Sequence, residues 1–301
     1  MKPARTLLPA ALALALGAAH AHDTWFAALP ATGGATLLAL GTGTRFPAHE
    51  TGVEARFLVQ RACRAAGRPD AGPVPAPCAM PALYNEDRSL WLQPPAGAAT
   101  CWAQLAPFDI ELAPDKVPVY LGEIQATPDV RAAWAAMQAR GLPWRERYTK
   151  HARIELAAPS SEPAPTDLDL HLETAGQPVR VGSPLTAQAL LHGQPLAGLA
   201  LELRSENSPL GLWQRTDAQG RITVSVPLPG RWLLRGVDLH VSGSDPERWD
   251  SRFATLAFDA GPAADAGDQK GSSLTLNARS TSQPAATTAI SKEPPSSTAR
   301  R

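Results

Sequence analysis

The sequence lacks the features that mark a membrane span, a nucleic-acid surface or a familiar enzyme. Its longest apolar run, residues 7–16, has about half of the roughly 20 residues that a membrane-spanning helix needs, so we expect no membrane span. Its 28 Lys and Arg balance 28 Asp and Glu, which argues against binding to nucleic acid. The motifs G-x-S-x-G and H-E-x-x-H and the phosphate loop are also missing, and we predict no enzymatic activity.

The start of the chain is typical of a secretory signal. Two basic residues precede the apolar run, and small residues then lead to a cleavable sequence that ends at Ala21. We expect cleavage after Ala21, so that His22 is the first residue of a periplasmic protein. Cleavage after Ala19 is the alternative and would place His20 first. Either product begins with a histidine.

Short strands separated by turns dominate the rest of the pattern. The 30 prolines and 23 glycines punctuate short runs such as ATLLALG, VEARFLVQ and SLWLQPP, whose Val, Leu and aromatic residues are typical of strands. We predict a mainly β fold with two immunoglobulin-like β-sandwich domains, at residues 22–157 and 167–260, joined by a linker at 158–166. Residues 261–301 are rich in Ala, Ser, Thr and Pro, which predicts a disordered tail.

In one part of the first domain the spacing of apolar residues changes to that of a helix, which predicts a helical segment at residues 114–150. In TPDVRAAWAAMQARG, Thr127 can cap the helix, Pro128 occupies the first helical position and Gly141 follows the end. The sequence PWRERYTKHARIEL then returns toward a strand pattern, with Ala152 and Ile154 on one face.

The chain has only three cysteines, Cys63, Cys78 and Cys101, all in the first half. In an oxidising compartment, one disulfide and one free thiol is the simplest arrangement. Pairing Cys63 with Cys78 would close a short loop rich in Pro and Gly and stabilise the protein by roughly 3 kcal/mol. The sequence does not fix the pairing.

A histidine at a free amino terminus is a metal chelate. After cleavage at Ala21, His22 would offer its α-amino nitrogen and its imidazole Nδ1 to one ion, as in a histidine brace. Both groups can lose their protons near neutral pH when a metal competes. Such nitrogen-rich sites favour Cu(II), and then Ni(II) or Zn(II).

Further ligands would have to come from the fold. In RWLLRGVDLHV the alternation of a strand places Asp238 and His240 on the same face, roughly 7 Å apart. This pair could converge on one ion, or it could simply be the solvated end of a strand. His49, beside Glu50 in the loop GTRFPAHE, is a weaker candidate, because ligands often lie in loops but a surface histidine needs no special explanation.

Several motifs together resemble a known family. AHDTWF, RERYTKHAR, GQPLAGLALELR, TDAQGRITVSVPLPGRWLLRGVDLH and WDSRFATLAFD follow one another as in a bacterial periplasmic family of unknown function that is linked to nickel uptake (nickel uptake transporter family, periplasmic component). The resemblance covers residues 22–260. It implies a second domain of the carboxypeptidase-regulatory type, a connection with divalent metal uptake, and a histidine soon after Trp-Leu-Leu-Arg, a position that His240 fills.

These observations predict a periplasmic protein that binds one Ni(II) or Cu(II) ion and delivers it to a membrane uptake system. His22 would be the anchor, His240 the third nitrogen ligand, and Asp238 or His49 an auxiliary ligand. One alternative is a metal-free binding or adhesion module. The other is a histidine-brace copper oxidase, although nothing in the sequence marks a substrate surface.

Overall fold

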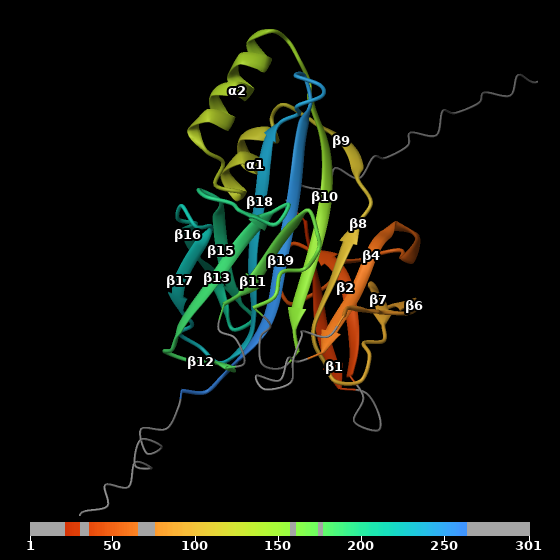
Figure 1. Cartoon of the computed structure of the whole chain (residues 1–301). Helices are drawn as coiled ribbons and strands as arrows, with labels where there is room; N and C mark the ends of the chain where they lie inside the picture. Colours follow the sequence, from red (N-terminus) through yellow and green to blue (C-terminus); the bar gives the residue numbers. More distant parts are fainter. Residues whose placement is uncertain (1–21, 31–35, 66–75, 157–160, 174–176, 264–301) are drawn as a thin grey trace, which may run out of the picture. The chain divides into compact units, whose positions relative to one another are not determined.

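The computed structural model describes residues 22–30, 36–65, 76–156, 161–173 and 177–263, and it is mainly β (Figure 1). The strands are β1 (Asp23–Pro30), β2 (Thr36–Gly43), β3 (Thr51–Gly52), β4 (Leu58–Ala65), β5 (Cys78–Ala79), β6 (Ala82–Glu86), β7 (Ser89–Leu92), β8 (Ala98–Leu105), β9 (Phe108–Leu112), β10 (Trp144–Glu155), β11 (Leu168–Leu172), β12 (Val179–Arg180), β13 (Pro184–Leu191), β14 (Gln194–Pro195), β15 (Ala200–Ser205), β16 (Ser208–Arg215), β17 (Arg221–Ser225), β18 (Gly230–Val241) and β19 (Trp249–Gly261). The helices are α1 (Val117–Glu123) and α2 (Pro128–Ala139), and a 3₁₀ turn covers Ala55–Phe57. The predicted leader at 1–21 and most of the predicted tail, from residue 264, lie outside the described residues.

The described strands form three sheets. The largest has the strand order β16-β15-β18-β19-β10-β8-β4-β5, with β12 beside β19 and β9 beside β10. A five-stranded sheet has the order β1-β2-β7-β6, with β3 beside β2. A four-stranded sheet has the order β11-β13-β14, with β17 beside β13.

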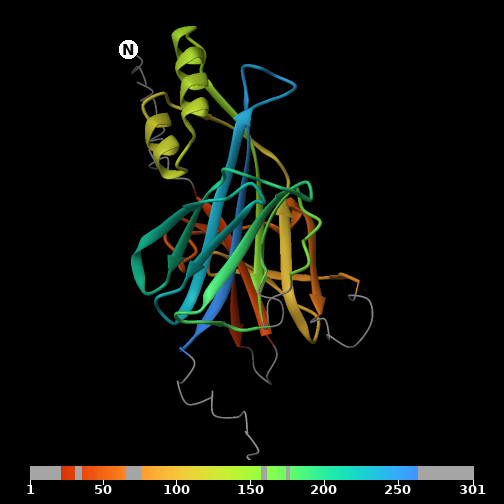
Figure 2. The ribbon, with the colours of Figure 1, turned by 60° about the vertical axis from the view of Figure 1, so that its left-hand side comes forward.

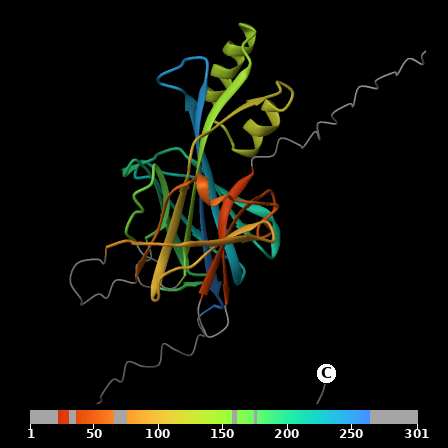
Figure 3. The same cartoon turned by 90° about the vertical axis from the view of Figure 1, so that its right-hand side faces the viewer.

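The large sheet separates two hydrophobic cores, which gives three layers of strands (Figures 2 and 3). Its β18 shows this directly, because Leu233 packs into the core under the five-stranded sheet while Trp232 and Leu234 pack into the core under the four-stranded sheet. Successive side chains of a strand point to opposite faces, so this alternation identifies β18 as part of the middle layer. The prediction of a β-sandwich fold is confirmed.

The boundary predicted at residues 158–166 divides neither the large sheet nor the two cores cleanly, because the core under the five-stranded sheet also contains Leu233 and Ala257. Strands β4, β8 and β10 come before it, and β15, β16, β18 and β19 come after it, yet all belong to the large sheet. They meet where β10 pairs with β19 in parallel, from Glu146 opposite Trp249 to Ile154 opposite Ala257. A buried polar layer lies at the same junction, where Arg153 pairs with Glu155 at 2.8 Å and with Asp169 at 3.1 Å.

The helical insertion packs against the start of β10, the end of β18 and the start of β19 (Figure 1). The Thr127 hydroxyl accepts a hydrogen bond from the Val130 amide, which confirms the predicted cap of α2. The helices end at Ala139 and β10 begins at Trp144, so the last residues of the predicted helical segment 114–150 are strand. Trp144 of β10 stacks on Trp249 of β19 and closes a third apolar cluster under the helices.

Cys63 of β4 is disulfide-bonded to Cys101 of β8, and Cys78 is free and exposed. The short-loop pairing of Cys63 with Cys78 is therefore not the one in the structure. Both Cys101 and Cys78 lie directly opposite Cys63, but Cys101 is buried with it in the core, whereas Cys78 is exposed at the edge. No helix among the described residues is both long and apolar enough to cross a membrane.

Candidate metal site at the start of β1

His22 lies just before β1, with a side chain that is 46% exposed. The strand that follows is held along its whole length by β2, from Asp23 opposite Gly43 to Pro30 opposite Thr36. The Nε2 atom of His22 lies 3.7 Å from Oε2 of Glu50. The start of the strand thus places an accessible imidazole beside a carboxylate.

Glu50 is held in place by the chain that follows β2. Its Oε1 accepts hydrogen bonds from the Thr44 amide at 3.2 Å and from the Thr44 hydroxyl at 2.5 Å. The Glu50 amide in turn donates to the carbonyl of Thr42 at 2.8 Å. One oxygen of the Glu50 carboxylate is therefore bound to its own loop, and the other faces His22.

Asp23 fixes the backbone directly after His22. Its carboxylate is 1% exposed and lies 2.9 Å from Nε of Arg235 on β18 and 3.8 Å from Nη1 of Arg204 on β15. Glu202 joins both cations, at 2.8 Å from Arg204 and 3.0 Å from Arg235. Burial raises the pKa of the Asp23 carboxyl, and the two guanidinium groups oppose that shift. We call Asp23, Glu202, Arg204 and Arg235 the anchor network.

A cavity of about 240 Å³ adjoins the anchor network. Its lining residues include Arg204, Arg235, Trp213 and Glu123. Thr44, which holds Glu50, also lines this cavity. Among the residues that line it, the carboxylates of Glu123 and Glu202 balance the guanidinium groups of Arg204 and Arg235, so the lining carries no net charge.

His49, the residue before Glu50, is held in the structure by hydrogen bonds to both of its ring nitrogens. Its Nδ1 lies 2.8 Å from the Ser89 hydroxyl and its Nε2 lies 3.2 Å from the Trp25 carbonyl, so both nitrogens are engaged. Burial lowers its pKa to about 4, against the hydrogen bond to Trp25, and the ring is neutral at pH 7. A Cβ at Gly41 would lie 2.3 Å from the ring, so a glycine is required for this packing.

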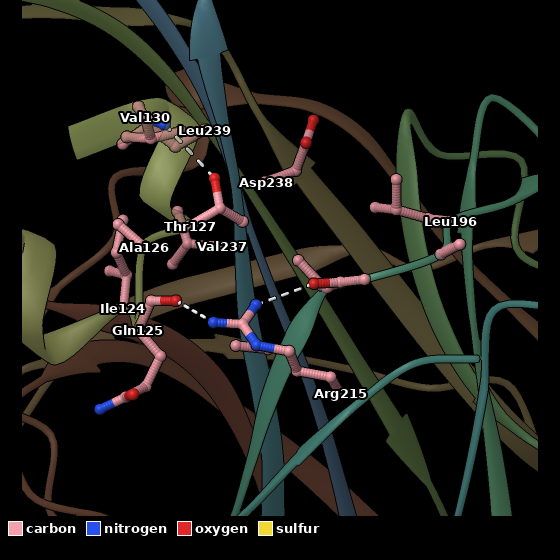
Figure 4. A pocket seen from close by; sticks show the side chains of 14 residues that line it. Ile124, Gln125, Ala126, Thr127, Val130, Leu196, Arg215, Val237, Asp238 and Leu239 are labelled. Carbon is pink, nitrogen blue, oxygen red and sulfur yellow. Dashed lines mark hydrogen bonds between the residues drawn. The ribbon is translucent and has the colours of Figure 1, made fainter. Parts of the chain in front are cut away.

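Asp238 and His240 form a pair of their own near the outer end of β18. Nδ1 of His240 lies 3.5 Å from Oδ2 of Asp238, and Nη1 of Arg252 lies 3.2 Å from the same oxygen. Burial disfavours the charged form of Asp238, but His240 and Arg252 outweigh it and hold its pKa below the usual value. Asp238 also lines a small pocket of about 120 Å³ between the α1–α2 connection and β18 (Figure 4).

The strand geometry separates this pair from His22. Arg235, which contacts Asp23, and Asp238 are three positions apart on β18 and so point to opposite faces. The described residues contain no group of three or more His, Cys, Asp or Glu side chains arranged to hold a metal. The structure brings His22 to Glu50, and Asp238 to His240, but it does not bring the four predicted residues together.

Two residues at this site were not predicted as part of it. Glu50 follows His49 in the sequence, and the loop composition marks both without showing which one faces the terminus. Asp23 is adjacent to His22, but its partners lie on strands far along the chain, and no local pattern indicates them. No family model matches this chain, and no curated protein matches it either.

Proposed function

We propose that the mature protein binds one Ni(II) or Cu(II) ion in the periplasm through His22 and passes it to a membrane uptake system. The observation that carries the proposal is the position of His22: an accessible imidazole beside Glu50, on a backbone that the next residue anchors. The resemblance to the nickel-uptake-linked family points to the same role.

Removal of a leader after Ala21 would give His22 a free α-amino group. That nitrogen and Nδ1 would then hold the ion, which leaves Nε2 for the carboxylate it already faces, at 3.7 Å in Glu50. A histidine ligand commonly donates its second ring N–H to a carboxylate, which sets the tautomer and makes the other nitrogen more basic. We assign this orienting role to Glu50, with Thr44 holding it.

The anchor network supports the proposal through rigidity. A chelate loses less entropy on binding when its backbone is already ordered. Because Asp23 is buried against Arg235, His22 cannot move far from Glu50 without breaking a buried ion pair.

A metal-free binding module is the second candidate, and one observation favours it. Strand β16 is an edge of the large sheet and exposes Leu210 and Trp213, at 76% and 37%. Exposed apolar residues on a sheet edge are typical of a surface that binds another chain. This candidate predicts that substitutions of His22 leave the protein's binding properties unchanged.

Calorimetry with NiCl₂ and with CuSO₄ on mature protein, produced without a tag at its amino terminus, tests the proposal. We expect binding tighter than about 1 μM to one of the two ions, which corresponds to about 8 kcal/mol. Loss of an orienting partner typically weakens metal binding roughly 10- to 100-fold, and we expect Glu50→Gln to fall within that range. Insertion of one alanine before His22 should weaken binding by more than this. His240→Ala is the matched control and should leave the affinity unchanged.

Two results would contradict the proposal. One is binding weaker than about 1 μM for both ions in the unmodified protein. The other is an alanine insertion that leaves the affinity unchanged, because the amino nitrogen would then have no part in the site. Oxygen consumption by the reduced copper form with an added substrate would instead support the oxidase alternative.

A further inference from the structure

The three cysteines of the chain stand in one row across three neighbouring strands. Cys63 of β4 lies directly opposite Cys101 of β8 on one side and directly opposite Cys78 of β5 on the other. Directly opposite residues of antiparallel strands have their Cα atoms about 4.5–5.5 Å apart and their side chains on the same face. A disulfide needs Cα atoms about 4.4–6.8 Å apart. The register therefore gives Cys63 two possible disulfide partners.

The packing around Cys63 brings the end of β5 close to the disulfide. Met80, the residue that follows β5, has its Sδ atom 3.6 Å from Sγ of Cys63. Cys63, Cys101 and Met80 are all fully buried, whereas Cys78 is free and exposed at the edge. The exposed thiol thus lies next to a buried disulfide, along the line of strand pairing.

We propose that Cys78 is the attacking thiol of an internal thiol–disulfide exchange site. Its thiolate attacks Sγ of Cys63, a Cys78–Cys63 bond forms, and the Cys63–Cys101 bond breaks. The electron pair leaves on Sγ of Cys101, which takes up a proton from solvent to replace the one that Cys78 released. One disulfide and one thiol are present before and after, so the step needs no oxidant or reductant.

Cys63 is the sulfur attacked because β5 pairs with β4 and not with β8. The exchange moves the covalent link from between β4 and β8 to between β4 and the edge strand β5. It also moves the free thiol from an exposed position to one in the core. The two isomers therefore differ in whether a thiol reagent reaches the folded protein.

Disulfide mapping of the full mature chain tests this exchange. The protein is held folded at pH 8.5 without reductant, quenched with acid and digested with pepsin at low pH, where exchange stops. We expect a peptide that links Cys63 to Cys78 to appear with time beside the one that links Cys63 to Cys101. A map that contains only the Cys63–Cys101 link at all times would overturn the proposal.

The double variant Cys78→Ser with Ala79→Cys is the matched control. It keeps one exposed thiol on β5 but moves it to the residue opposite Ala62, on the other face of the strand. We expect no new disulfide in this variant under the same conditions. Exchange at an equal rate in the control would also overturn the proposal, because the reaction would not depend on the row of three cysteines.

A second measurement does not depend on the equilibrium between the isomers. In Cys101→Ser, the reagent DTNB should modify Cys78, and Cys63 should then displace the bound thionitrobenzoate, so that two equivalents of the coloured anion are released per chain. Adding Cys78→Ser and Ala79→Cys to this variant should reduce the release to one. A release of one equivalent from folded Cys101→Ser, with circular dichroism showing the native spectrum, would contradict the geometry.

Discussion

Two pairs of histidine and aspartate lie on opposite faces of the large sheet, and each is accompanied by arginine. In the first, Asp23 turns inward to Arg235 of β18, and His22 remains accessible beside Glu50. In the second, Asp238 of β18 itself lies 3.5 Å from its own histidine, His240. The same residue types are therefore arranged in two different ways.

The difference is decided by where the aspartate lies. Asp23 is almost fully buried, and burial raises its pKa, so its stable setting depends on the two guanidinium groups of the anchor network. Asp238 is partly exposed, and His240 and Arg252 lower its pKa despite its burial. In the first pair, Asp23 contacts arginines of the large sheet, and His22 stays accessible beside Glu50. In the second pair, Asp238 contacts its own histidine, His240.

Asp23→Asn should have the largest effect on stability of any single substitution in either pair. The substitution removes the negative charge that faces the buried Arg235 and the partly exposed Arg204, and it leaves both guanidinium groups with Glu202. Breaking a buried ion pair by removing one partner costs about 3–5 kcal/mol. We expect a loss of about 3 kcal/mol in the free energy of unfolding, measured by urea denaturation at pH 7.

The matched control for that change is Glu50→Gln, at a position where the carboxylate is exposed. We expect its stability to change by less than about 1 kcal/mol, because its contacts are solvated. If Asp23→Asn is as mild as Glu50→Gln, the anchor network does not hold the start of β1, and His22 is not kept rigid by it.

The stability of the protein should also depend on pH, through a third histidine, His49. Burial lowers its pKa to about 4, whereas the unfolded chain binds a proton at about 6.5. The unfolded state therefore holds more protons between these values, so stability is highest above pH 6.5 and falls as the pH drops to about 4. This group alone accounts for a loss of up to about 3 kcal/mol over that window.

His49→Gln tests this assignment, since glutamine does not titrate. The variant should lose less stability than the unmodified protein between pH 6.5 and 4, in urea denaturation at several pH values. His151, whose pKa burial also lowers to about 4, should supply part of the dependence that remains, and carboxyl groups with lowered pKa values such as Asp238 should supply another part. An unchanged pH profile in His49→Gln would show that the ring is accessible and can take a proton in the folded state.

Local patterns in the sequence predict the local parts of this fold. Thr127, Pro128 and Gly141 define the second helix, because capping depends on residues only a few positions apart. The alternation in β10 likewise identifies Ala152 and Ile154 as core. The sharing of one sheet by strands from both halves has no local signal, since the parallel pairing of β10 with β19 joins residues about 100 positions apart.

The same distinction applies to the two charged sites. The Asp238–His240 pair follows from strand alternation alone, and the structure places the two side chains together. The contact of His22 with Glu50 and of Asp23 with Arg235 depends on how β1 packs on the large sheet. The disulfide shows the same limit, because Cys78 and Cys101 both lie opposite Cys63, and only the packing of the strands buries Cys101 and leaves Cys78 exposed.

His240→Ala should give the smallest effect on stability, and it completes the comparison of the two pairs. The side chain is 42% exposed, and its ion pair with Asp238 is solvated, so we expect a change below about 1 kcal/mol in the free energy of unfolding. The carboxyl of Asp238 keeps Arg252 as a partner in this variant. A loss as large as that of Asp23→Asn would contradict this comparison. The end of β18 would then depend on its charged pair as much as the start of β1 depends on the anchor network.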